Sequence, residues 1–114
     1  MSSQITFNLE QGAMQFNFSR QAALELQAAL VEIMQLLKQR AAQGGEPTPK
    51  TQAQPMEYQY TGDVFLEVFC NPNIWASPFA ARALVTLRDE RIRVTTEAEL
   101  NRLYEDVLTY LDQT

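Results

Sequence analysis

The first residues of the chain constrain the fold most, because apolar and polar side chains alternate there in two consecutive runs. The apolar positions are Ile5, Phe7 and Leu9 in the first run and Met14, Phe16 and Phe18 in the second. A period of two is typical of a β-strand with one buried and one solvated face. Glu10-Gln11-Gly12 lies between the runs and predicts a tight turn, since glycine tolerates a positive φ. The pattern therefore predicts a β-hairpin.

Residues 20–42 are almost all strong helix formers, and the hydroxyl of Ser19 before them can cap the first turn. One apolar stripe of this helix should pack on the sheet; it comprises Ala22, Leu26, Ala29, Leu30, Ile33 and Leu37. Leu24, Ala28 and Val31 fall on nearly the opposite face. Two interpretations of that second stripe stay open: scattered surface residues, or a face covered by the linker, a partner or a second copy.

Residues 43–55 predict a flexible linker rich in proline, glutamine and glycine. Gly44-Gly45 ends the helix, and Pro47, Pro49 and Pro55 keep it from restarting. Such a long stretch without secondary structure is uncommon inside a compact domain. A tolerated surface loop is favoured over a lid that closes on a site.

Residues 64–70 predict a central strand, because both alternating faces are apolar. Phe65 and Phe69 share one of these faces. They meet a further layer of structure or form an exposed aromatic patch.

Residues 83–95 fit two patterns. Ser77-Pro78 could open a helix, whereas the polar Arg88-Asp89-Glu90 between alternating runs predicts a hairpin. The β-branched residues and the alternation of Arg91 and Arg93 favour the hairpin. Thr96-Glu97-Ala98-Glu99 then matches a capping box ahead of an amphipathic helix that runs to the C-terminus.

These elements predict one α+β domain over residues 1–114 in the order β-β-α-β-β-β-α. We expect a five-stranded, mostly antiparallel sheet with two helices on one face.

The residue types needed for common catalytic and metal sites are missing. The chain has no histidine, and its single cysteine, Cys70, lies in an apolar strand pattern. Without a cluster of cysteine and histidine there is no zinc site, and no glycine-rich loop precedes a helix. Paired carboxylates could support a hydrolase, but those of the last helix are scattered over its polar face. We therefore expect no catalytic residue, no metal and no cofactor.

The net charge of −5 argues against binding to nucleic acid or to an anionic membrane. Arg91 and Arg93 belong to a local cluster of arginines, for which protection of an edge strand is favoured over binding of an acidic peptide. The lone cysteine and the absence of a basic, apolar leader predict a cytoplasmic protein.

Trp75 and Phe79 lie in an irregular stretch after the central strand. They either anchor that loop in the core or, with Phe65 and Phe69, form an apolar binding groove, since large aromatic residues are enriched at binding hot spots.

The stretch from Ala83 to Leu100, with Tyr110-Leu111 near the end, resembles small α+β proteins of cyanobacteria and, among these, the CcmS family of β-carboxysome assembly factors. The resemblance implies a non-catalytic adaptor that binds the tail of a carboxysome shell protein.

The favoured function is that of a non-enzymatic adaptor or assembly factor that captures a short peptide segment of another protein by strand addition. The expected partner-binding residues are Trp75, Phe79, Phe65, Phe69, Leu24, Val31, Arg91 and Arg93. One alternative is a homodimeric structural or regulatory protein that uses the stripe of Leu24 and Val31. A second is a carboxylate-based hydrolase.

Overall fold

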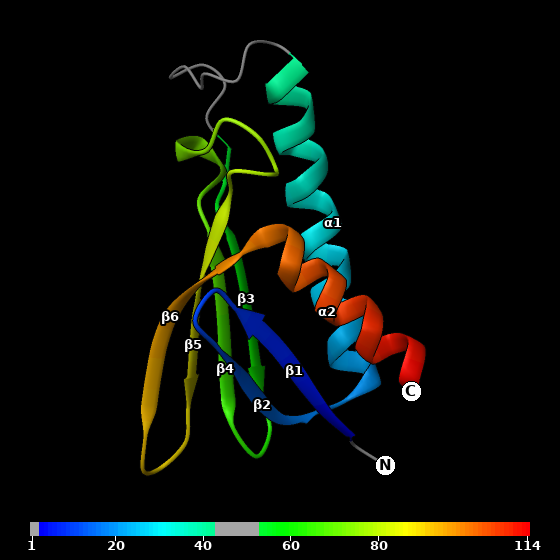
Figure 1. Ribbon diagram of the computed structural model, residues 1–114, viewed down its shortest axis with the longest axis vertical. Coiled ribbons are helices and arrows are strands. Elements are labelled where there is room, and N and C mark those ends of the chain that lie inside the picture. Colours follow the sequence, from blue (N-terminus) through cyan, green and yellow to red (C-terminus); the bar gives the residue numbers. More distant parts are fainter. Residues whose placement is uncertain (1–2, 43–52) are drawn as a thin grey trace.

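The computed structural model describes residues 3–42 and 53–114, and it confirms the α+β class. The strands are β1 (Ser3–Leu9), β2 (Gly12–Phe18), β3 (Met56–Thr61), β4 (Phe65–Cys70), β5 (Arg82–Arg88) and β6 (Arg93–Glu99). The helices are α1 (Arg20–Ala42), the short 3-10 helix η1 (Pro72–Ile74) and α2 (Leu100–Gln113) (Figure 1).

The described strands form two antiparallel sheets, so the prediction of a single five-stranded sheet was wrong. β1 and β2 pair as a hairpin, and the other four strands form a sheet in the order β3-β4-β5-β6. The missed strand is β3, which directly follows Pro55. Residues 43–52 of the predicted linker lie outside the described part of the chain.

The N-terminal hairpin is confirmed. Ile5 pairs with Phe16 and Phe7 with Met14, and all four side chains are buried. Gly12 follows the turn with a φ of 137°, a conformation that side chains other than that of glycine rarely adopt.

Both helices and the hairpin lie on the same side of the four-stranded sheet (Figure 1). An aromatic cluster joins these layers. The ring of Phe18 on β2 makes T-shaped contacts with Phe16 and with Tyr60 of β3, and it also lies against Tyr110 of α2. Tyr58 of β3 donates a hydrogen bond from its hydroxyl to the carbonyl of Ala22 in the first turn of α1.

The apolar stripe predicted for residues 20–42 packs into this core. Leu26, Leu30 and Leu37 are fully buried, and Ser19 caps the helix by accepting from the amide of Ala22. α2 packs against α1 and β1.

The predicted capping box was wrong, because residues 96–99 belong to β6. Ala98 pairs with Ala83 and Glu97 with Leu84, so the ladder with β5 satisfies this stretch of backbone. Glu99 is the N-cap of α2 and makes no side-chain capping bond; the amide of Leu100 donates instead to the carbonyl of Ala81.

The hairpin interpretation of residues 83–95 is confirmed by the pairing of β5 with β6. The carboxylate of Asp89 holds the turn by accepting from the amides of Arg91 and Ile92, and these bonds keep the pKa of Asp89 below its ordinary value.

Candidate functional site

A groove lies between the second half of α1 and the residues that lead into β3. Along its first half, α1 packs against α2, whereas its second half extends beyond α2 and the hairpin (Figure 1). The groove has a volume of about 530 Å³, within the range of roughly 300–1,000 Å³ that is common for binding pockets. Its walls are formed by Ala29, Glu32, Ile33, Gln35, Leu36, Gln39, Ala53, Gln54, Pro55, Met56 and Glu57.

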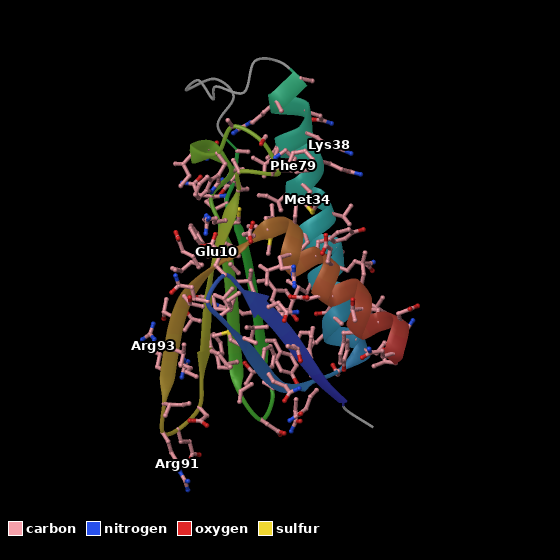
Figure 2. The ribbon with its side chains drawn as sticks, in the orientation of Figure 1. Glu10, Met34, Lys38, Phe79, Arg91 and Arg93 are labelled. Atoms are coloured by element: carbon pink, nitrogen blue, oxygen red, sulfur yellow. The ribbon has the colours of Figure 1, made fainter. Side chains whose placement is uncertain are left out.

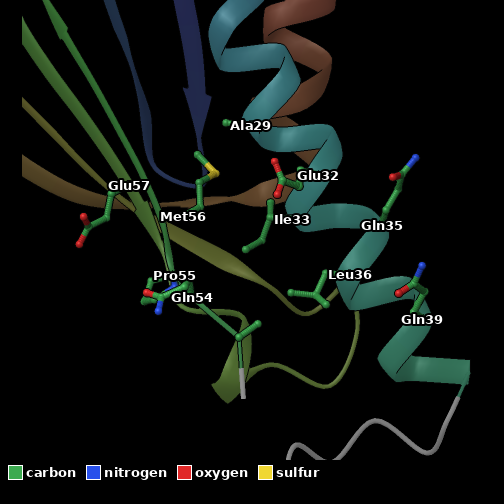
Figure 3. A pocket seen from close by; sticks show the side chains of 11 residues that line it. Ala29, Glu32, Ile33, Gln35, Leu36, Gln39, Gln54, Pro55, Met56 and Glu57 are labelled. Atoms are coloured by element: carbon green, nitrogen blue, oxygen red, sulfur yellow. The ribbon is translucent and has the colours of Figure 1, made fainter. Parts of the chain in front are cut away.

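The floor of the groove is apolar. Ile33 and Leu36 point from α1 towards the strand that carries Met56 (Figure 3). Ile33 and Met56 are buried, whereas Leu36 is half-buried and open to an incoming side chain. Polar side chains, including three glutamine amides, surround this floor. An apolar centre with polar groups around it is the usual composition of a site that binds an organic ligand or peptide.

Among the residues that the structure describes, the charged ones in the wall are acidic. Glu32 comes from α1 and is exposed; Glu57 of β3 borders the groove, but its side chain points away from α1 (Figure 3). The net charge of the whole chain is also negative, at −5. The groove therefore favours a ligand that combines an apolar group with positive charge.

Asn73 fixes the strand-side wall of the groove. Its side chain accepts from the amide of Ala53 at 2.9 Å and donates to the carbonyl of Ala53 at 2.8 Å. The same Oδ1 atom accepts from Nη1 of Arg40 at 2.9 Å, and Arg40 also donates to the carbonyl of Pro72. One side chain thus ties η1, the end of α1 and the start of the β3 segment together, so the groove is held open by fixed contacts.

β3 is an edge strand. Within the described residues its only strand partner is β4. The groove lies beside the start of this strand, at Met56 and Glu57. An extended peptide in the groove would therefore lie next to main-chain groups that lack a partner strand.

The expected aromatic groove does not form. Trp75 is half-buried and packs against the core, with its Nε1 atom buried and lacking a hydrogen-bond partner among the described residues. Phe79 is 83% exposed. Phe65 and Phe69 are on the face of the sheet that turns away from α1. The anchoring interpretation thus holds for Trp75, and the four aromatic residues do not meet in one site.

Phe65 and Phe69 lie on an open sheet face, which agrees with the interpretation as an aromatic patch. Both are half-buried, and the guanidinium of Arg88 lies 4.3 Å from the centre of the Phe65 ring. Leu84, which pairs with Phe69, is 45% exposed.

The other expected binding residues are distributed over separate surfaces. Leu24 and Val31 are on α1 and do not line the groove; Leu24 is 39% exposed and Val31 is half-buried. Arg91 lies at the tip of the β5–β6 hairpin, at the opposite end of the molecule from Phe79, and Arg93 lies on β6 (Figure 2). Arg93 shares its sheet face with Phe65 and Phe69.

Leu36 and Met56 belong to the floor of the groove and were not singled out from the sequence. For Met56 a signal exists, because Met56, Tyr58 and Tyr60 alternate with polar residues as in a strand. Leu36 lies beside the predicted stripe and carries no separate signal.

Cys70 is fully buried, and burial raises the pKa of its thiol from 9.0 to about 11. Fewer thiolates at a given pH mean slower attack on a thiol reagent. We expect the native protein to react with a disulfide reagent at pH 8 at least about a hundredfold more slowly than the guanidinium-unfolded protein, as two pKa units imply. The free energy of unfolding should also fall as the pH rises from 9 to about 11, since only the unfolded thiol then loses its proton. Equal reaction rates in the two states would contradict this assignment of Cys70 to the core.

Among residues 3–42 and 53–114 no group of three or more histidine, cysteine, aspartate or glutamate residues is placed to hold a metal ion. No helix in that part of the chain has the length and apolar character needed to cross a membrane. No protein-family model, curated protein or solved structure matches the chain.

Proposed function

We propose that the protein is a non-catalytic adaptor that binds an extended, apolar and basic peptide segment of a partner protein in the groove between α1 and β3. The observation that carries the proposal is the combination of an apolar floor, acidic residues as the only charges, and an adjacent strand edge without a partner among the described residues.

Each part of the site has a separate task in this proposal. Ile33, Leu36 and Met56 take up an apolar side chain of the peptide, and Glu32 attracts its lysine or arginine residues. Main-chain groups at the start of β3 bond the peptide backbone by strand addition. The resemblance to carboxysome assembly factors makes the tail of a shell protein the first partner to try.

The groove is less suited to a carboxylate-based hydrolase. A general acid must be kept protonated by apolar surroundings, whereas Glu32 and Glu57 are open to solvent. The carboxylate of Asp106, near β1, already accepts two hydrogen bonds from Asn8. Neither observation favours a catalytic pair of carboxylates.

The test is a selection of peptides from a random library on the immobilised full chain, followed by affinity measurements with the selected peptides and with shell-protein tails. We expect the selected peptides to share an apolar residue flanked by lysine or arginine. Leu36→Asp should weaken their binding at least about tenfold, because it places a charge on the apolar floor. Glu32→Lys should weaken it by a smaller factor that shrinks as salt is added.

The matched controls lie on the same helix. Leu24→Asp and Glu25→Lys make the same chemical changes at exposed positions outside the groove, and we expect both to bind as the wild type does. If Leu24→Asp weakens binding as much as Leu36→Asp does, the peptide binds elsewhere on α1. Selected peptides without basic residues would contradict the proposed role of the acidic wall.

A further inference from the structure

The four-stranded sheet has one open face, turned away from the helices and the hairpin (Figure 1). The register of the strands arranges its side chains in three rows that run across β3, β4, β5 and β6. The first row is Glu57, Phe69, Leu84 and Glu97; the second is Gln59, Glu67, Thr86 and Thr95; the third is Thr61, Phe65, Arg88 and Arg93. We call this surface the outer face.

The apolar residues of the outer face lie on its two central strands, and its first and third rows carry opposite charges. Phe69 and Leu84 occupy the centre of the first row, and glutamates lie at both ends of that row. The third row carries Phe65 and two arginines. Among the described residues Arg93 and Glu97 form no ion pair with any other residue, and both are exposed. The rows lie about 7 Å apart, so the first and third rows are separated by roughly 14 Å along the strands.

We infer that the outer face binds a second copy of this chain, sheet against sheet, about a twofold axis that runs parallel to the rows. Such an axis leaves each strand opposite the same strand of the other copy and reverses its direction. The first row of one copy then faces the third row of the other. Phe69 meets Phe65 of the second copy, and Glu97 meets Arg93 of the second copy, with each contact made twice. The middle row faces itself, so Glu67 lies opposite Glu67 of the second copy.

The charges select this arrangement over the other face-to-face dimer. A twofold axis parallel to the strands would place each row opposite itself, so that Glu57 of one copy faced Glu97 of the other. That dimer has two like-charge contacts and sets Arg93 opposite Thr61, whereas the proposed dimer has one like-charge contact, at Glu67, against two pairs of Glu97 with Arg93. Packed sheets cross at about 30°, which the long side chains of arginine and glutamate can follow. The proposal does not depend on the groove beside α1.

The size of the face sets the strength expected for the dimer. Four strands about 4.8 Å apart and about seven residues long cover roughly 450 Å² per copy, below the roughly 800 Å² per partner of stable interfaces. We therefore expect a reversible dimer whose dissociation constant is micromolar or weaker and rises with salt.

The test is sedimentation equilibrium of the full chain at increasing concentration, at low and high salt. The wild type should pass from monomer to dimer. Arg93→Glu and Glu97→Arg should each raise the dissociation constant about tenfold or more, because each turns two attractive pairs into repulsive ones. Arg91→Glu makes the same charge change at the hairpin tip and should leave association nearly unchanged.

The proposed axis also predicts two combinations of variants in which dimerisation is restored. Association through a different surface would restore it in neither. The double variant Arg93→Glu with Glu97→Arg should dimerise again, since opposite charges face each other once more. The two single variants should form a mixed dimer when combined, because both contacts between residues 93 and 97 are then attractive. A wild type that stays monomeric up to millimolar concentration would overturn the inference and leave the face to a different protein. Dimers that persist in both single variants, or that fail to recover in the double variant, would overturn the proposed axis.

Discussion

Replacing Phe18 by alanine should lower the free energy of unfolding by about 4 kcal/mol, the usual cost of removing a large aromatic side chain from a core. Phe18 is fully buried at the centre of the aromatic cluster. Its ring contacts Phe16 in the hairpin, Tyr60 in the four-stranded sheet and Tyr110 in α2, with ring centres 5.6, 4.8 and 5.9 Å away. The substitution therefore weakens the contacts between three parts of the fold at once.

The measurement is urea-induced unfolding followed by circular dichroism, with Phe79→Ala as the matched control. Phe79 is 83% exposed, so its replacement should change the free energy of unfolding by less than about 0.5 kcal/mol. A small domain is stable by roughly 5–15 kcal/mol, so Phe18→Ala should remove a large share of the total. A loss below 1 kcal/mol in Phe18→Ala would mean that the hairpin does not pack on the sheet as described.

The sequence predicts those elements in which local pattern and tertiary packing agree. The alternation between Ile5 and Phe18 predicts the N-terminal hairpin because one of its faces packs into the core and the other faces water. The stripe of residues 20–42 predicts α1 for the same reason. The outer face can be predicted in part as well, since the alternation within β4 assigns Phe65 and Phe69 to one side of the sheet.

The errors arise where a local pattern fits two structures. Thr96-Glu97-Ala98-Glu99 has the composition of a capping box, but pairing with β5 satisfies its backbone as a strand. β3 alternates like a strand, but it follows directly on the proline-rich stretch 43–55, and no element is predicted for residues 56–61. In neither case do the neighbouring residues alone decide which of the two structures forms.

The groove depends on contacts between residues that are distant in the sequence. Asn73 bonds Ala53 and Arg40, which are 20 and 33 positions away. These bonds determine how the end of α1 lies relative to the start of β3. A sequence pattern gives no information on such a distance, so Leu36 and Met56 could not be assigned to a common site before the fold was known.

Asp106→Ala should lower the free energy of unfolding by about 3 kcal/mol, as expected when a buried charged acceptor of hydrogen bonds is removed. Asp106 on α2 is only 7% exposed. Its carboxylate accepts from the backbone amide of Asn8 at 2.7 Å and from the Asn8 side chain at 2.9 Å. Because that backbone amide points away from β2, it has no partner strand, and the alanine variant leaves it without an acceptor.

Asp106→Asn separates the effect of the acceptor from that of the charge. One amide oxygen can still accept from the backbone of Asn8, so we expect a loss of only about 1–2 kcal/mol. Asp112→Ala, an exposed position on the same helix, should be nearly neutral. Hydrogen exchange gives the direct readout: the amide of Asn8 should be protected in the wild type, partly protected in Asp106→Asn and fast-exchanging in Asp106→Ala. If this amide is equally protected in all three proteins, Asp106 does not hold β1 against α2, and the hairpin must be fixed by its other contacts, which include the aromatic cluster and the ion pair of Glu10 with Arg82.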